Sequence, residues 1–150
     1  MDALKKSGIK KVVVVGRRGH VQASFTMKEL RELTKLEGAT FVVEEEDLDA
    51  SMNEATKKEI KDGRVPKRMD KLLRKSAGRK VQKDDTELKL LFLRSPVEIL
   101  PSEEDPTSVG SIRVTINELK GDPGSQSARA TGESEIIDCD LVLRSVGYMG

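Results

Sequence analysis

Four consecutive valines, Val12 to Val15, constrain the fold of this 150-residue chain more than any other feature. They complete a nearly continuous β-branched run that begins at Ile9 and is followed directly by "GRRGH". A strand with one face in water alternates polar and apolar residues, and this run does not. It therefore predicts a short strand that is covered on both faces in a parallel sheet.

A helix is well specified soon after this strand. Thr26, with Glu29 three residues later, has the pattern of a capping box, and Phe25 and Leu30 occupy the two positions of a hydrophobic staple. Gly38 is placed to end the helix. The next apolar segment predicts a second strand, "ATFVV".

Two further helices and a β-rich second half are expected. The helices run from about Asp47 to Asp62 and from Pro66 to Ala77. After Gly78 the apolar pattern predicts strands in "ELKLLFLRS", "VEIL", "SIRVTINEL" and "SEIIDCDLVLRSVGY". The segments "PSEEDPTS" and "GDPGSQSARATG" read as exposed loops. The expected fold class is α/β, with parallel strands and helices followed by an antiparallel β meander and a final strand.

The totals exclude several classes of protein. A chain of 150 residues is expected to form one domain. The single cysteine, Cys139, excludes an internal disulfide, and with the lone His20 it leaves too few ligands for a structural zinc ion, so no metal site is expected. We expect Cys139 to be a small core residue. No stretch approaches the roughly 20 apolar residues that span a bilayer, so no transmembrane segment is expected.

Two adjacent arginines, Arg17 and Arg18, follow the first strand. Ligands of open α/β sheets bind beyond the carboxyl ends of the strands, and arginines at such an end accept the 2'-phosphate of NADPH where an acidic residue would hold a ribose hydroxyl. The alternative is that one arginine pairs with an acid and the other is solvated. The arginine pair alone leaves both interpretations open.

The stretch "VVVVGRRGHVQASFTMKELREL" closely resembles the NADPH-binding domain of the adrenodoxin reductase family, the FAD-containing NADPH:ferredoxin reductases. The family pattern is a hydrophobic strand, GRRGP, then Q, then FT-KELRE. Further similar blocks follow in the same order: "KRMDKLLRKSA", "LFLRSPVEILPS" and "CDLVLRSVGY". The resemblance implies an incomplete Rossmann-like nucleotide-binding domain of the glutathione-reductase type.

The resemblance also implies roles for particular residues. Arg17 and Arg18 would hold the 2'-phosphate of NADPH, and Glu29 would line the cofactor site, a role that competes with its place in the capping box. Arg64 and Arg68 would dock an acidic [2Fe-2S] ferredoxin. His20 stands where the family usually has proline, and we expect a solvated turn histidine there.

The resemblance places these residues in one part of a larger enzyme. Residues 1–150 would be a partial NADPH-binding domain, without its first strand and Gly-rich turn and without the FAD domain. FAD would be held mainly by parts absent from this chain, which would contain no catalytic residue. The isolated chain is then expected neither to retain FAD nor to turn over NADPH. The family resemblance implies a mitochondrial matrix location, although no targeting segment is recognisable in this chain.

The basic segment from Lys57 to Lys83 is the second candidate surface. It contains 12 basic residues and only three acidic ones. A non-enzymatic basic binding module is one alternative, but the segment has no aromatic residue to stack on bases and no recognition motif, so no nucleic-acid partner is expected. A related flavoprotein, such as the small subunit of glutamate synthase, is the other alternative. It would not be expected to combine "FTMKELREL" with a basic docking helix.

Overall fold

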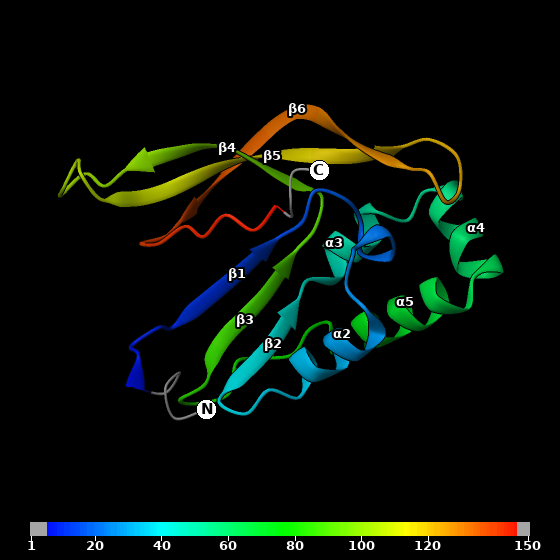
Figure 1. Ribbon diagram of the computed structural model, residues 1–150, viewed down its shortest axis with the longest axis horizontal. Coiled ribbons are helices and arrows are strands. Elements are labelled where there is room, and N and C mark those ends of the chain that lie inside the picture. Colours follow the sequence, from blue (N-terminus) through cyan, green and yellow to red (C-terminus); the bar gives the residue numbers. More distant parts are fainter. Residues whose placement is uncertain (1–5, 147–150) are drawn as a thin grey trace.

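The computed structural model describes residues 6–146, which form two three-stranded sheets and a group of helices (Figure 1). The first sheet is parallel, with strand order β1-β3-β2. Its strands are β1 (Lys11–Val15), β2 (Ala39–Val43) and β3 (Thr86–Leu91). The valine run therefore forms a parallel strand, as expected, but β1 lies at the edge of the sheet and Val12 and Val14 are each 36% exposed, so the expected cover on both faces is wrong. The "ELKLLFLRS" strand lies at the centre of this sheet, and its expected place in the meander is wrong.

The helices follow the order expected from the sequence, but two of their limits differ. The helix expected to end at Gly38 ends at Thr34. The segments are η1 (His20–Gln22), α2 (Met27–Thr34), α3 (Glu45–Ala50), α4 (Glu54–Asp62) and α5 (Arg64–Ser76). The single helix expected from Asp47 to Asp62 is two helices. Asn53 separates them because its side-chain oxygen accepts the N–H of Thr56 at 2.8 Å and so caps a new helix.

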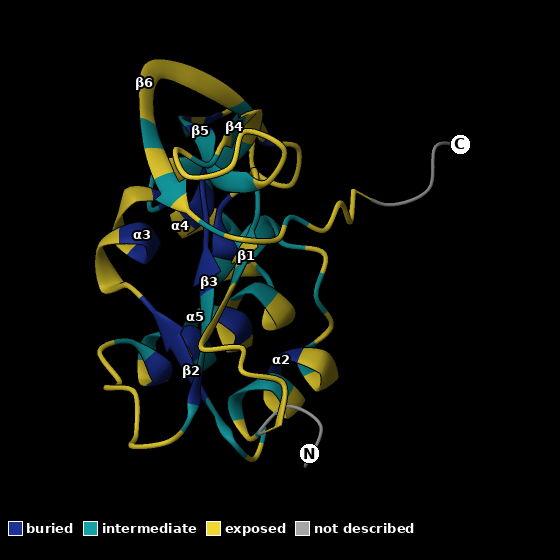
Figure 2. Cartoon of the chain, turned by 90° about the vertical axis from the view of Figure 1, so that its left-hand side faces the viewer, coloured by how far each residue is buried: buried dark blue, intermediate teal, exposed yellow. Residues whose placement is uncertain are grey.

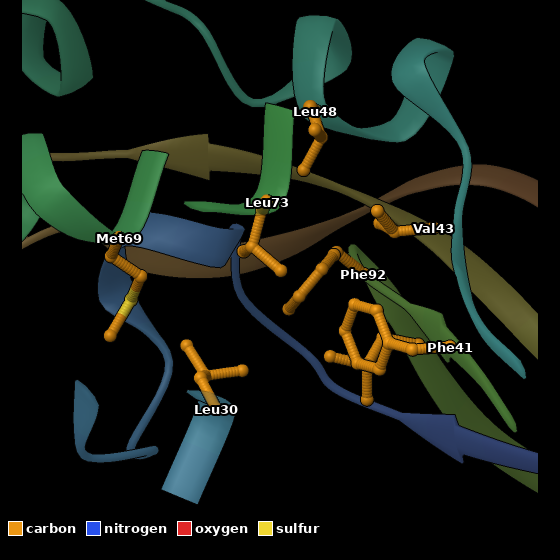
Figure 3. Packing of buried hydrophobic residues seen from close by; sticks show 8 residues of the cluster. Leu30, Phe41, Val43, Leu48, Met69, Leu73 and Phe92 are labelled. Atoms are coloured by element: carbon orange, nitrogen blue, oxygen red, sulfur yellow. The ribbon is translucent and has the colours of Figure 1, made fainter. Parts of the chain in front are cut away.

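The core lies between the helices and one face of the parallel sheet. Figure 3 shows Leu30 of α2 and Met69 and Leu73 of α5 gathered near Phe41 and Phe92. Burying each such side chain stabilises the fold by about 1.5–3 kcal/mol. Figure 2 shows the same concentration of buried residues along the sheet, with exposed residues on the outer helix faces.

The second sheet is antiparallel, with strand order β4-β5-β6. Its strands are β4 (Arg94–Pro101), β5 (Val109–Lys120) and β6 (Ser127–Asp138). The loop expected over "GDPGSQSARATG" is wrong in its second half, which belongs to β6. The pairing of β5 with β6 shifts register between Thr115 and Asn117, and Gly132 in the facing part of β6 has φ +91°. Such an irregular strand segment accommodates residues that are typical of turns. The combined architecture confirms the expected α/β class.

The final strand expected in "SEIIDCDLVLRSVGY" is formed only as far as Asp138. Residues 141–146 have no strand partner within the described part of the chain, and the side chain of Leu143 is 80% exposed. The segment "DALKKSG" also predicts a helix that ends at Gly8, but most of it falls on residues 1–5, which lie outside the described residues, as does Tyr148. No helix within residues 6–146 has the length and apolar character needed to cross a membrane.

Candidate functional site

The four residues from Gly16 to Gly19, here called the arginine loop, follow directly after the carboxyl end of β1. Each of their backbone carbonyls accepts a hydrogen bond. The Gly16 carbonyl accepts the N–H of Arg94 at 3.0 Å, and the Arg18 carbonyl accepts that of Leu93 at 3.1 Å. The Arg17 carbonyl accepts the side-chain amide of Asn117 at 3.0 Å. The loop is therefore held by the β3–β4 connection and by β5.

The opposite sides of these peptides carry the free donors. In a trans peptide the N–H points away from the preceding carbonyl, so the amides of Arg17 and Arg18 point away from the anchors. Within residues 6–146, neither amide has an acceptor and neither guanidinium has an ion-pair partner. Both arginine side chains are exposed. The loop thus presents two charged donors at the edge where ligands of parallel sheets bind.

Close packing at Gly19 and an unusual backbone conformation at Leu93 fix the position of the arginine loop. A Cβ on Gly19 would lie 2.7 Å from Cβ of Ser51 and 3.1 Å from Cδ1 of Leu119, so a larger residue there would displace the loop. Leu93 is buried with φ +56°, a left-handed conformation that is unusual for leucine. Its N–H donates to Arg18, and its carbonyl accepts the N–H of Asn117 at 2.8 Å. These bonds hold Leu93 in that conformation.

Glu29 has the capping role that the sequence predicts. Its carboxylate accepts the N–H of Thr26 at 2.7 Å, while the hydroxyl oxygen of Thr26 accepts the N–H of Glu29 at 3.1 Å. The carboxylate is exposed, and no hydrogen bond or ion pair joins it to Arg17 or Arg18 within the described residues. The capping box is confirmed, and the cofactor role of Glu29 stays a prediction.

His20 is fully buried, so the expected solvated turn histidine is wrong. Its Nδ1 lies 2.9 Å from the Ser51 hydroxyl oxygen, and its Nε2 lies 2.8 Å from a carboxylate oxygen of Asp70. The ring also meets Phe92 edge to face, with 6.0 Å between centroids. Burial lowers the pKa of His20, and Asp70 opposes this through its hydrogen bond and its charge.

Arg64 and Arg68 lie one turn apart on α5, and both side chains are exposed. The opposite side of this helix buries Met69 and Leu73 in the core. No carboxylate within residues 6–146 pairs with either arginine. Three lysines of α5 are exposed and unpaired in the same way: Lys67, Lys71 and Lys75. The helix therefore carries uncompensated positive charge toward solvent.

Arg74 differs from the other basic residues of α5. It pairs with Asp49 of α3 at 2.5 Å and with Asp70 at 3.4 Å. Asp49 belongs to an acidic segment, residues 44–49, that places negative charge in the first turn of α3 and also supplies ion pairs. In the same segment, Asp47 pairs with Arg94 at 3.4 Å. Burial raises the pKa of Asp47, while the charge of Arg94 lowers it.

Cys139 has the character of an inert thiol. It is partly buried, and burial together with the charges of Asp140 and Asp138 raises its pKa. A thiol of raised pKa is a weak nucleophile at neutral pH. The preference for a packing role over a nucleophilic one agrees with this environment.

Several residues of the site carry no recognisable signal in the sequence. Asn117 interrupts an apolar strand, Ser51 lies between two helices, and Asp70 is one of many charged residues on α5. Their partners are 100, 31 and 50 residues away along the chain, respectively. Only the folded structure brings them to the arginine loop.

No family model matches the chain, but comparisons with known proteins and solved structures found clear similarities. It is 38% identical over 154 residues to the mitochondrial NADPH:adrenodoxin oxidoreductase of Arabidopsis thaliana, covering 99% of this chain and 31% of that protein. It is 39% identical over 151 residues to NADPH-ferredoxin reductase FprA of Mycobacterium tuberculosis, covering 100% of this chain and 32% of that protein.

A solved structure of Mycobacterium tuberculosis FprA in complex with NADPH matches with a TM-score of 0.81 and 39% identity. The match covers 99% of this chain and 32% of the FprA chain. The chain therefore spans about a third of the length of the proteins it resembles. Its fold is that of the corresponding segment of a nucleotide-binding oxidoreductase.

Proposed function

We propose that this chain, which is homologous to about one third of the NADPH:adrenodoxin and NADPH-ferredoxin reductases, is part of the NADPH-binding domain of such an enzyme. The enzyme would pass electrons from NADPH through FAD to a [2Fe-2S] ferredoxin. FAD would supply the step from hydride to single electrons, and it would be held mainly by segments beyond this chain. The residues described here would select the nucleotide and receive the protein partner.

The arginine loop is the observation that carries this proposal. Its carbonyls are held by Leu93, Arg94 and Asn117, whereas the guanidinium groups of Arg17 and Arg18 are free. A phosphate bound there would receive charge-assisted hydrogen bonds, each worth about 1.5–3 kcal/mol. The 2'-phosphate is the group that distinguishes NADPH from NADH, so the loop would act as a selector between them.

The test measures kcat/KM for NADPH and for NADH in the reductase that contains this chain. We expect a strong preference for NADPH and a loss of about 10- to 100-fold in that preference for Arg17→Ala or Arg18→Ala, one charged hydrogen bond each. The catalytic efficiency with NADH is expected to change little.

Arg129→Ala is the matched control, since Arg129 is an exposed arginine of β6 on the second sheet. It should leave the ratio of the two efficiencies intact. Equal use of NADPH and NADH by the unmutated enzyme would refute the proposed selection.

The exposed side of α5 would be the docking face for the ferredoxin. Arg64 and Arg68 are unpaired, unlike Arg74, so their charge is available to a partner. An acidic partner would be steered by this face, and the encounter rate would fall as salt screens the charges.

Reversal of both charges tests the docking face. We expect Arg64→Glu with Arg68→Glu to slow ferredoxin reduction by about 10-fold or more at low salt, since steering of this kind raises association rates by 10- to 1,000-fold. Reduction of a small uncharged dye should be unaffected.

The control is Lys80→Glu with Lys83→Glu, two exposed lysines that follow α5 in sequence. It makes the same change in net charge and should leave ferredoxin reduction close to normal. Equal losses with ferredoxin and dye in the α5 variant would contradict docking.

A mitochondrial matrix location is part of the same proposal. The support for this location is the similarity to mitochondrial enzymes of a plant and of vertebrates. The bacterial FprA is similar at the same level of identity, so a direct test is needed. Fractionation of cells that express the natural gene, followed by protease protection of the organelle fraction, distinguishes a matrix protein from one outside mitochondria.

A further inference from the structure

His20 follows the arginine loop directly and is the first buried side chain after the two exposed arginines. Its backbone begins η1, and the N–H of Gln22 closes that turn on the carbonyl of Gly19 at 3.2 Å. Any movement of the imidazole is therefore passed to the loop through a short, hydrogen-bonded turn.

The ring is held by three elements that come from distant parts of the chain. Ser51 follows α3, Asp70 lies on α5, and Phe92 follows β3. Asp70 is itself held, because Arg74 donates to it at 3.4 Å. The imidazole thus fixes the end of the arginine loop against the helix that carries Arg64 and Arg68.

The hydrogen bonds limit where the protons of this cluster can lie. Asp70 as a carboxylate only accepts, so His20 Nε2 carries a proton and donates to it. In the neutral ring Nδ1 is then an acceptor, and the hydroxyl of Ser51 donates to it. The same hydroxyl lies 2.9 Å from the Leu48 carbonyl, to which it would donate if both ring nitrogens carried protons; beside a neutral ring that carbonyl accepts only the backbone N–H of Ser51, at 3.3 Å. Both ring nitrogens are satisfied without a net charge.

We propose that His20 is a positioning residue for nucleotide selection, which holds the arginine loop through Ser51 and Asp70 so that Arg17 and Arg18 face the same phosphate. This inference rests on the proposed function of the loop. His20 is fully buried, so it would not contact a bound nucleotide directly. Its effect is exerted through the geometry of the two arginines.

A purely structural role makes a different prediction. A histidine that only fills the core would affect stability when replaced, and it would leave the preference between NADPH and NADH unchanged. A positioning role predicts a selective loss with NADPH, because only NADPH carries the phosphate that needs both arginines.

The experiment compares His20→Leu and His20→Gln in the reductase that contains this chain. For His20→Leu we expect the preference for NADPH to fall by about 10-fold, mainly through a higher KM for NADPH, with kcat at saturation and efficiency with NADH nearly unchanged. His20→Gln retains an amide donor toward Asp70 and should restore part of the preference.

Asp70→Ala provides a second route to the same measurement if His20→Leu does not fold. This substitution removes the carboxylate that accepts from His20 Nε2 without changing any residue of the arginine loop. It should also lower the preference for NADPH over NADH. Asp62→Ala, at an exposed aspartate of α4, is the matched control and should leave the preference unchanged.

The possible outcomes separate the two proposals. If Arg17→Ala loses the preference for NADPH but His20→Leu keeps it, the role of His20 is overturned and the selection by the arginine loop stands. Asp70→Ala takes the place of His20→Leu in this comparison if His20→Leu does not fold. The absence of any preference in the unmutated enzyme overturns both the selection by the arginine loop and the role of His20.

Discussion

At the scale of single residues, the sequence predicts local contacts well and distant contacts poorly. The capping box of Thr26 and Glu29 is three residues long, and the structure contains both of its hydrogen bonds. His20 binds Ser51 and Asp70, which are 31 and 50 residues away, and its environment was predicted wrongly. Burial of a histidine beside a charged turn depends on the helices that cover it, which no local pattern describes.

The two roles of Glu29 can be separated by substitution. Glu29→Gln keeps an oxygen that accepts the N–H of Thr26, so the unfolding free energy should stay within about 0.5 kcal/mol of the original. Thr26→Ala removes the cap and should lower it by about 1 kcal/mol. Urea denaturation measures both values.

The KM for NADPH of Glu29→Gln then reports on the cofactor role without the loss of the cap. A rise in this KM would support a contact between the carboxylate and the cofactor. An unchanged KM would restrict Glu29 to helix capping.

The buried imidazole predicts a dependence of stability on pH. Because burial lowers the pKa of His20 in the folded state, the unfolded chain takes up a proton first as the pH falls through about 6.5. The unfolding free energy should therefore decrease below that pH, by at most about 1.4 kcal/mol per pH unit from this group. The charged groups that act on the ring are Asp70, Arg74 and Asp49, of which Arg74 opposes protonation and the two carboxylates favour it.

Denaturation curves measured between pH 5 and 8 for the original chain and for His20→Gln isolate this contribution. The variant cannot titrate at this position, so its stability should vary less over this range. Identical pH profiles for the two proteins would contradict the lowered pKa.

At the scale of elements, the existence of helices and strands was predicted better than their limits and neighbours. The break between α3 and α4 depends on Asn53, whose side chain caps α4 and also donates to Gln126 at 2.6 Å. The central position of β3 in the parallel sheet is a matter of long-range pairing with β1 and β2. Periodicity identifies an apolar strand but not the strand beside it.

Helix α5 shows the same limit. Its basic composition and its buried apolar stripe were both evident in the sequence. The separation of Arg74, which is paired, from Arg64 and Arg68, which are free, depends on α3 lying beside α5. The structure thus divides the basic residues of α5 into a paired part and an exposed part.

Gly63 joins α4 to α5, and a substitution there tests the junction. A Cβ on Gly63 would lie 2.9 Å from the Glu59 carbonyl and 2.9 Å from the ring of Pro66. We therefore expect Gly63→Ala to lower the unfolding free energy by about 1–3 kcal/mol, as overpacking typically does. Gly78→Ala is the contrasting variant, because Gly78 has open space but a φ of +77°, so its cost is backbone strain alone. Comparable unfolding midpoints for Gly63→Ala and the original chain would show that the junction yields without cost.

At the scale of the whole molecule, the two sheets meet at the proposed site. Leu93 joins β3 to β4, and Asn117 of β5 reaches across to the arginine loop. Sequence patterns identified most strand segments, but neither the sheet to which β3 belongs nor this contact between the sheets. The arginine loop is thus a product of both halves of the chain, although its two charged residues are adjacent in the sequence.

Asn117 provides the test of this connection. Its side-chain amide donates to the carbonyl of Arg17 at 3.0 Å and to the hydroxyl of Ser95 at 2.8 Å, and the residue is buried. Asn117→Asp has nearly the same shape but no donor, so it leaves a buried charge against a carbonyl. We expect the unfolding free energy to fall by about 2–3 kcal/mol or more.

The same variant should also weaken the preference for NADPH over NADH, since the carbonyl that orients Arg17 loses its partner. Ser95→Ala removes only the second acceptor of Asn117 and should cost about 1 kcal/mol while the preference is retained. Stability from urea denaturation and the ratio of the two efficiencies, measured on both variants, separate the two effects. A destabilised Asn117→Asp enzyme with its NADPH preference intact would mean that the second sheet supports the fold but does not orient the arginine loop.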